Sequence, residues 1–164
     1  MSQPENRRKL QKQLRSAFKN GDVATFNAIR TKLDKAGIRT PDLSGIRLKR
    51  RLKLRGINLQ RTYLRDVDFA GSDLSRADLR DATCREADLS DCDLTEARFK
   101  GANLKKARLL AADVRRADFR KTNLNGALFF VRNKNSKRAK KAKHLGSARF
   151  KGAIRAPDFI ARFL

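Results

Sequence analysis

Lysine and arginine are the residues in this sequence whose type and spacing point most directly to a chemistry. The 164-residue chain holds 41 of them against 17 acidic residues, which gives a net charge of +24. An excess of this size favours binding to a polyanion, with nucleic acid ahead of an anionic membrane surface. Two dense clusters are candidates for phosphate contacts: Arg47, Lys49, Arg50, Arg51, Lys53 and Arg55 in the first, and Arg132, Lys134, Lys137, Arg138, Lys140, Lys141 and Lys143 in the second.

Residues for catalysis are much harder to find. The sequence has no P-loop, no dinucleotide-binding glycine motif, no nucleophile elbow and no metal-ligand spacing. Its single histidine, His144, lies at the end of the second basic cluster, where a solvated loop position suits it better than the role of a catalytic base. Two cysteines, Cys84 and Cys92, are too few for a disulfide framework or a zinc site and indicate a reducing intracellular location. We therefore expect no enzyme activity, no cofactor and no metal.

A five-residue repeat occupies the middle of the chain. Large apolar residues, with one cysteine among them, recur at every fifth position from Leu54 to Phe129, and a small residue such as Ala77 stands two positions before most of them. A period of five fits neither an α-helix nor a strand. The chain must instead turn a corner every five residues and place one large and one small side chain inside each time. Stacked turns then share a core that no single repeat could bury alone.

The repeated pattern A-D/N-L-x-x, as in Ala77-Asp78-Leu79-Arg80-Asp81, resembles the pentapeptide-repeat family over roughly residues 53 to 131. The resemblance implies a mainly β fold, a right-handed quadrilateral β-helix with four repeats per coil and about 4.8 Å between coils. In such a fold Cys84 and Cys92 are inward-facing core thiols. The repeated Asp side chains then bond the backbone at the corners and do not act as acids or bases.

Four repeats per coil would place residues twenty apart on one face. Two neighbouring faces then carry ladders of cations: Arg80, Lys100 and Arg120 on one, and Arg65, Arg85 and Lys105 on the next. Two interpretations stay open, because these ladders either track a phosphate backbone or form solvated faces that nearby acids partly neutralise. Those acids are Asp66, Asp78, Asp81 and Glu86. Tyr63 also faces outward, where its ring could stack on a base.

The charge is concentrated outside the repeats. Residues 1–56 carry a net +12, residues 57–131 a net +2 and residues 132–164 a net +10. Apolar stripes predict a helical hairpin over 4–19 and 22–36, with Asp22 as an N-cap and Gly37 as a C-terminal stop. We expect four segments: this basic hairpin capping one end (1–40), the β-helix (41–130), a basic loop excursion (131–144), and a final partial coil with a C-terminal cap (145–164).

The leading hypothesis is a non-catalytic, cytoplasmic protein that docks on the phosphates of nucleic acid, RNA somewhat ahead of DNA, within a ribonucleoprotein or packaged genome. The family implies a second hypothesis, since well-known members resemble DNA in shape and negative charge and protect gyrase from quinolones. A chain of net charge +24 departs from that pattern. A third is a phage- or effector-type interaction scaffold whose basic hairpin lies on an anionic membrane. No apolar run is long enough for a transmembrane helix. Relatives often dimerise through the C-terminal end, so monomer and dimer both stay open.

Overall fold

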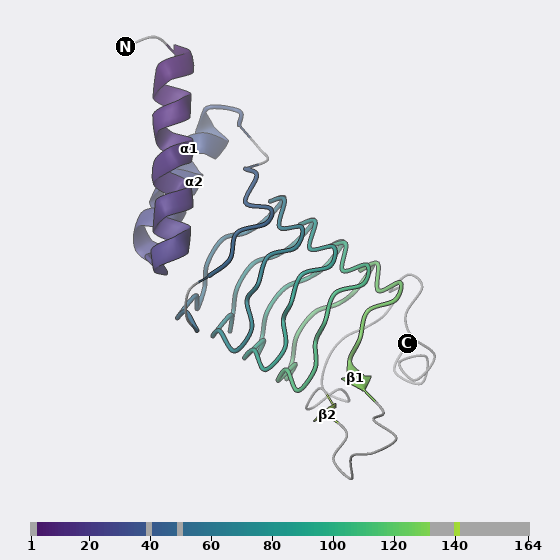
Figure 1. Ribbon diagram of the computed structural model, residues 1–164. Helices are drawn as coiled ribbons and strands as arrows, with labels where there is room; N and C mark the ends of the chain where they lie inside the picture. The colour runs from purple at the N-terminus through teal and green to yellow at the C-terminus, as the bar shows by residue number, and fades with distance from the viewer. Residues whose placement is uncertain (1–2, 39–40, 49–50, 132–139, 142–164) are drawn as a thin grey trace.

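The computed structural model describes residues 3–38, 41–48, 51–131 and 140–141 of the chain. Two helices, α1 (Gln3–Asn20) and α2 (Val23–Lys35), precede a stack of coils. A short antiparallel pair, β1 (Phe130–Val131) and β2 (Lys140–Lys141), follows the stack. Figure 1 shows the coils following one another along a single axis, with the helices at one end and the strand pair at the other. The final partial coil and cap expected at 145–164 lie outside the described residues.

Each corner of a coil is a tight turn of four residues. In the turn Leu74–Ala77 the N–H of Ala77 donates to the carbonyl of Leu74 at 3.0 Å. Arg76, the third residue, has a φ of 58°, and a positive φ at this position is typical of type II turns. Just before the turn, Asp73 Oδ1 accepts the N–H of Ser75 at 2.9 Å. The same bond recurs at Asp78, Asp88, Asp93, Asp113 and Asp118, which confirms the structural role expected for the repeated Asp.

Single-residue parallel β-bridges join successive coils. From Lys53 onward each bridge joins residues twenty apart, as in Asp73 with Asp93, so four five-residue repeats make one coil. The first coil holds one residue more, because Asp42 pairs with Tyr63 twenty-one positions later. Regular ladders of backbone hydrogen bonds result, such as Leu74 N–H to the carbonyl of Asp93 at 2.8 Å. The expected mainly β fold is therefore built from bridges, and in the described part of the chain only β1 and β2 are extended strands.

The repeat places its large and small apolar residues inside the coils, as predicted. Completely buried members of the large set are Leu64, Leu79, Leu89, Leu94, Phe99, Leu104 and Phe119. Phe99 and Phe119 stack with their ring centroids 5.0 Å apart. Where a polar residue takes the small position it bonds the backbone inside the coil, as Thr122 Oγ1 does by donating to the carbonyl of Phe99 at 2.7 Å. The hydroxyl of Thr122 is therefore satisfied inside the core, although it stands where other repeats have a small apolar residue.

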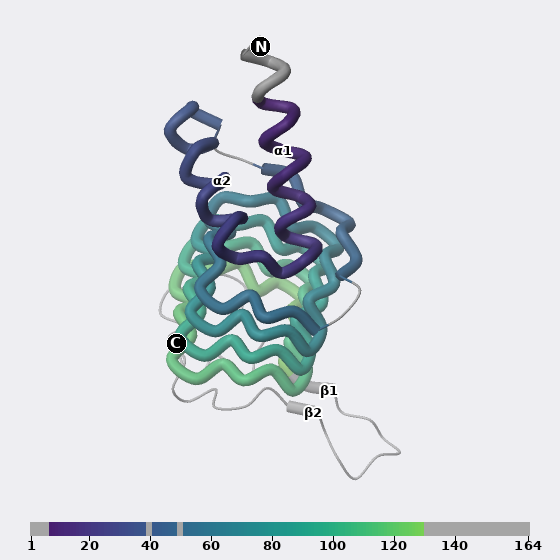
Figure 2. The backbone as a smooth tube through the Cα atoms, turned by 90° about the vertical axis from the view of Figure 1, so that its left-hand side faces the viewer, coloured from purple at the N-terminus to yellow at the C-terminus, as the bar shows by residue number. Residues whose placement is uncertain are grey.

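The helical hairpin lies over the open N-terminal end of the stack, as Figure 2 shows when viewed along the coils. Phe18 of α1 makes the central contact, with its ring 5.8 Å from that of Phe26 in α2 and 5.9 Å from that of Phe69 in the coils. Among the described residues, four hydrogen bonds fasten the helices to the first coil: Arg15 to the carbonyl of Asp42, Arg30 to the carbonyl of Gln60, the Asn27 amide to the carbonyl of Gly56, and Asn58 N–H to the Asn27 side chain. These contacts cover strand edges that would otherwise be open.

Local signals set the ends of α2. Asp22 caps the helix, its side chain accepting the N–H of Thr25 at 3.0 Å. At the other end Gly37 has a φ of 75°, and the N–H of Ile38 donates to the carbonyl of Leu33 at 2.8 Å. This is the Schellman arrangement, which favours glycine at the left-handed position.

Candidate nucleic-acid interface

The turn geometry gathers cations on one side of the β-helix. At most corners the two residues after the inward apolar residue are exposed or partly exposed, although Ser75, Ser90 and Leu110 are buried. The same positions of successive coils stack because the bridges are twenty residues apart. We call one of these surfaces the basic wall and define it as residues 60–66, 80–86, 100–106 and 120–126. It carries nine cations and three acids: Arg61, Arg65, Arg80, Arg85, Lys100, Lys105, Lys106, Arg120 and Lys121 against Asp66, Asp81 and Glu86.

The other surfaces of residues 57–128 have the opposite balance, with five arginines and nine acids. All five arginines make ion pairs, four of them to a carboxylate in a neighbouring coil. Their N–O distances run from 2.9 Å to 3.9 Å: Arg76–Glu96, Arg98–Asp78, Arg108–Asp88, Arg115–Asp113 and Arg116–Glu96. Every arginine on these surfaces is therefore neutralised by a nearby carboxylate, and the excess of acids leaves these surfaces net negative.

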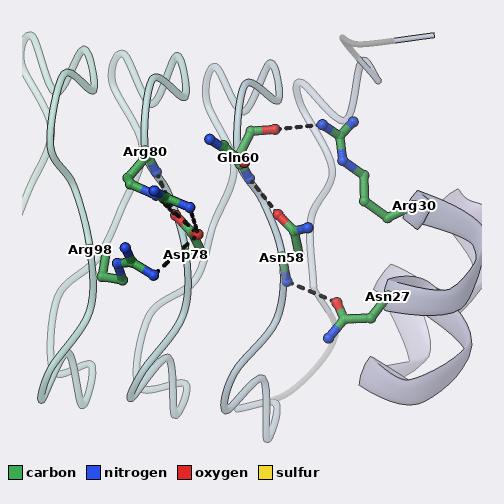
Figure 3. Close-up of polar contacts among 7 residues, drawn as sticks. All are labelled: Asn27, Arg30, Asn58, Gln60, Asp78, Arg80 and Arg98. Atoms are coloured by element: carbon green, nitrogen blue, oxygen red, sulfur yellow. Dashed lines mark hydrogen bonds and ion pairs between the residues drawn. The ribbon is translucent and has the colours of Figure 1, made fainter. Parts of the chain in front are cut away.

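On the basic wall, the first predicted ladder is less available than its sequence suggests. Arg80 and Arg120 turn toward the aspartates of their own corners, with N–O distances of 2.6 Å to Asp78 and 2.7 Å to Asp118. Figure 3 shows Arg80 and Arg98 from the next coil both directed at Asp78. Burial by itself raises the pKa of Asp78, but hydrogen bonds from Arg80 outweigh it and the pKa is lowered. Lys100 is the member of this ladder without an ion pair among the described residues.

The second predicted ladder contains one cation with ion pairs and two cations without them in the described part of the chain. Arg65 lies 3.2 Å from Asp66 and 3.7 Å from Glu86, which confirms partial neutralisation by those two acids. Lys105 makes no ion pair within the described residues. Arg85 makes none there either, and its Nε is buried without a hydrogen-bond partner. Arg85 is therefore, like Lys105, a cation without a carboxylate partner among the described residues.

Sequence reasoning missed three cations of the wall: Arg61, Lys106 and Lys121. They occupy the left-handed turn position, one residue after the position of the predicted ladders. With them, six cations of residues 57–128 have no ion pair among the described residues, and all six are on the basic wall: Arg61, Arg85, Lys100, Lys105, Lys106 and Lys121. The C-terminal half of the wall, residues 100–106 and 120–126, holds five cations and no acid.

Neutral polar residues separate the two corners of the wall. Tyr63, Thr83, Asn103 and Asn123 form one ladder of parallel bridges. Asn103 and Asn123 each use the side-chain oxygen to accept a turn N–H at 3.1 Å, from Lys105 and Asn125. Their NH₂ groups are left as donors between two rows of cations. Tyr63 is 47% exposed at the end of this ladder nearest the helices.

The described members of the cluster predicted between Arg47 and Arg55 are not brought together on one face. Arg47 bridges to Asp68 on one side of the coils and Lys53 bridges to Asp73 on another, while Arg55 follows at the next corner. Arg51 lies against Gly71. The physical reason is the period of five, because a run of nine residues passes two corners and cannot stay on one face. Lys49 and Arg50 lie outside the described residues.

Part of the second cluster is placed beside the last described coil. Lys140 and Lys141 form β2, whose backbone pairs with Val131 and Phe130 of β1. The sequence predicted only a loop excursion here, so the strand pair is an addition to that expectation. Arg132, Lys134, Lys137, Arg138, Lys143 and His144 lie outside the described residues.

Reactive groups in the described part of the chain are structural. Cys84 and Cys92 are free, buried thiols, as predicted, and burial raises the pKa of each to about 12. The described residues contain no group of three or more His, Cys, Asp or Glu side chains placed to hold a metal ion. None of the described helices has the length and apolar character needed to cross a bilayer.

Comparison with known proteins identifies the repeat. The family model for pentapeptide repeats matches eight copies over residues 42–81, 72–109, 82–120 and 97–129, more than half of the chain. A comparison with curated proteins gave no significant match. Among solved structures, a pentapeptide repeat protein from the Arabidopsis thaliana thylakoid lumen is 27% identical, with a TM-score of 0.51 and coverage of 78% of this chain and 93% of that one.

Two further solved structures illustrate the range of similarity. A pentapeptide repeat protein from Nostoc PCC 7120 is 36% identical and covers 61% of this chain and 72% of its own, with a TM-score of 0.32. QnrB1, a plasmid-mediated fluoroquinolone resistance protein, is 17% identical over 68% of this chain and 56% of its own, with a TM-score of 0.39. The family match implies a right-handed β-helix.

Proposed function

Since this chain belongs to the pentapeptide-repeat family, we propose that it is a non-catalytic binding protein that holds nucleic-acid phosphates on the basic wall of its β-helix. One observation carries the proposal. Every cation of residues 57–128 that has no ion pair within the described residues lies on this wall, and every arginine elsewhere in that range is paired. A segment that is nearly neutral by composition therefore presents one positive surface.

A polyanion is the ligand that suits such a surface. Cations without a carboxylate partner can replace the counterions condensed on a phosphate backbone, and release of those ions is what drives binding. The amide and hydroxyl groups between the two corners supply neutral donors for phosphate or sugar oxygens. RNA is placed ahead of DNA because two basic flanks of net +12 and +10 extend from the repeat body, an arrangement suited to docking in a ribonucleoprotein.

The test compares two variants of equal charge. In the wall variant Arg61, Lys100, Lys105, Lys106 and Lys121 become Gln, and in the control variant Arg76, Arg98, Arg108, Arg115 and Arg116 become Gln. Binding to RNA and DNA is measured at several salt concentrations. We expect the wall variant to reduce the slope of log affinity against log salt by about 3 to 4 units on single strands, at about 0.7 per lost contact. The control variant should keep the wild-type slope, although it loses the same charge.

The second basic cluster enters the proposal as an additional contact region. Replacing Lys137, Arg138, Lys140, Lys141 and Lys143 with Gln should lower the slope further when it is combined with the wall variant, with little change in melting temperature. Equal loss of affinity across unrelated sequences is expected, because phosphate contacts position a protein without reading bases.

Two results would contradict the proposal. The first is no binding to RNA or DNA at low salt. The second is inhibition of a type II topoisomerase in a supercoiling assay that survives both the wall and the cluster variants, together with weak affinity for free nucleic acid. That outcome would favour the topoisomerase-directed alternative.

A further inference from the structure

A small pocket lies where α1 meets the first coil, at the helical end of the basic wall. Its volume is about 160 Å³, and it is lined by Gln11, Leu14, Arg15, Pro41, Asp42 and Leu43. Three of these lining residues, Leu14, Pro41 and Leu43, are apolar and buried. This volume is below the range of about 300 to 1,000 Å³ that is usual for sites of drug-sized ligands. The pocket therefore suits one small, flat group.

Tyr63 lies one step along the ladder from this pocket. Its N–H donates to the carbonyl of Pro41 at 3.0 Å, and its carbonyl accepts the N–H of Leu43 at 2.9 Å. The ring projects from the residue directly beneath the pocket lining, and Tyr63 is the one aromatic residue that is largely exposed in the described part of the chain. Arg61 and Arg65 flank it at the two adjoining corners. A small pocket with both polar and apolar lining, an exposed ring and cations thus adjoin one another.

The polar groups of the pocket suit a base better than a phosphate. Hydrogen bonds from Ser44 lower the pKa of Asp42, so its carboxylate is ionised at neutral pH and repels a phosphate. A carboxylate and the Gln11 amide can accept an N–H, and all four bases carry an N–H donor on the Watson–Crick edge. Arg15 is held in place by its hydrogen bond to the carbonyl of Asp42 at 2.6 Å.

We infer that this pocket receives an unstacked base of single-stranded nucleic acid, while a neighbouring base stacks on Tyr63 and the phosphates lie along the cations of the basic wall. The inference rests on the proposed function and adds to it the form of nucleic acid that binds. A duplex keeps its base faces stacked and its Watson–Crick edges paired, so it can use the cations but neither the pocket nor the ring. Base–aromatic stacking tolerates any sequence because every base has a π face.

The test uses three probes with the same number of phosphates: a single-stranded RNA, the same strand with abasic sites replacing its bases, and a duplex. We expect wild-type protein to bind the single strand at least about fivefold tighter than the abasic strand, with equal salt slopes. Tyr63→Leu, which keeps an apolar side chain, and Gln11→Phe, which fills the pocket, should each reduce this preference. Tyr63→Phe should retain it, because the ring remains.

The outcomes separate this inference from the proposed function. If wild-type protein binds the abasic strand as tightly as the native strand, the base pocket is excluded and the phosphate-binding wall stands. If it binds none of the three probes at low salt, both are excluded. If Tyr63→Phe loses the preference as fully as Tyr63→Leu, stacking on the ring is excluded. Melting temperatures of the variants are measured beside the affinities, and the wild-type comparison of probes does not depend on any variant folding.

Discussion

At the scale of single residues, the backbone strain of this fold is concentrated at its corners. Eleven residues other than glycine have φ values between 54° and 61°, in the left-handed region that costs L-residues about 1–2 kcal/mol each: Arg61, Asp66, Arg76, Asp81, Glu86, Asp91, Glu96, Lys106, Ala111, Arg116 and Lys121. Turn hydrogen bonds and buried apolar side chains on either side hold them there. Ten of these eleven residues are charged and none of the ten is buried, so the strained position is also one where the surface charge can vary.

Replacing Ala111 with glycine should stabilise the protein. Ala111 has a φ of 58° and its side chain makes no polar contact that would be lost. Relief of the left-handed strain exceeds the entropy cost of glycine, so we expect a gain of up to about 1 kcal/mol in the free energy of unfolding. Gly101→Ala is the matched reverse change, with a φ of 76° and a new Cβ that meets the Asp81 carboxylate. Urea unfolding measures both, and shifts of the same sign would contradict this account.

The two cysteines should be inert in the folded protein. Both are buried, and a pKa of about 12 leaves almost no thiolate at neutral pH, so an aromatic disulfide reagent should react slowly until the protein unfolds. The raised pKa also determines how the stability of the folded protein changes with pH. The contribution of each thiol to stability is complete below its ordinary pKa of 9.0 and is lost as pH rises toward 12. Cys84→Val, which copies the residue at Val114, should make this alkaline loss shallower.

The sequence predicted which residues lie inside the coils, but it did not predict which residue of each corner takes the left-handed backbone conformation. A period of five assigns Leu79 or Phe99 to the interior with no further information, because every other register would expose the whole set. The corner position did carry a signal, since Gly56, Gly71 and Gly101 share it. Charged residues fill most other repeats at that position, and glycine preference alone does not predict a left-handed lysine or glutamate. The cations Lys106 and Lys121 were missed for this reason.

At the scale of elements, a few polar side chains join the hairpin to the first coil. Asn27 of α2 donates to the carbonyl of Gly56 at 3.2 Å and accepts the N–H of Asn58 at 2.8 Å. Its amide thus replaces the backbone partners that another coil would supply. Arg30 adds a hydrogen bond to the carbonyl of Gln60 at 2.9 Å, which Figure 3 shows. It also forms an ion pair with Asp34 at 3.1 Å.

Asn27→Ala should destabilise the protein by about 1 to 3 kcal/mol, because it leaves a partly buried N–H and a carbonyl of the first coil without partners. Thermal unfolding measures the loss, and hydrogen exchange at Asn58 N–H should accelerate. Gln13→Ala, at an exposed position of α1, is the control and should change stability by less than about 0.5 kcal/mol. Equal stability of the two variants would show that the amide does not join the elements.

Local signals predicted the hairpin, and long-range contacts escaped prediction. The expected helices, 4–19 and 22–36, differ by one residue at each end from Gln3–Asn20 and Val23–Lys35, because caps such as Asp22 act over three or four residues. The hydrogen bond between Asn27 and Asn58 joins residues 31 apart in the sequence. No local sequence pattern around either residue predicts it. For the same reason, the pocket between α1 and Pro41–Leu43 had no counterpart in the sequence pattern.

At the scale of the whole molecule, two electrostatic effects act in opposite directions when salt is added. Ion pairs between coils weaken, but they are exposed for the most part, and such pairs contribute about 0 to 1 kcal/mol each. Mutual repulsion among the charges of a chain with net +24 weakens as well, and it acts among all of them at distances up to the Debye length, about 10 Å at 0.1 M salt. Repulsion outweighs the ion pairs, since the unpaired cations of the basic wall lie in adjacent coils and at adjacent corners.

The melting temperature should therefore rise when salt is increased from about 0.05 M to about 0.5 M, because screening shortens the reach of this repulsion. Single-stranded RNA at low salt should raise it further, since a ligand that binds only the folded state stabilises it by mass action. The wall variant with five cations replaced by Gln has a net charge of +19, from 24 less 5, and should show a smaller rise with salt and with RNA. The control variant of equal charge, with its arginines removed from ion pairs, should lose stability while keeping the response to RNA. A melting temperature that falls with salt in the wild-type protein would mean that the ion pairs between coils outweigh the repulsion, and that the positive wall does not destabilise the folded state.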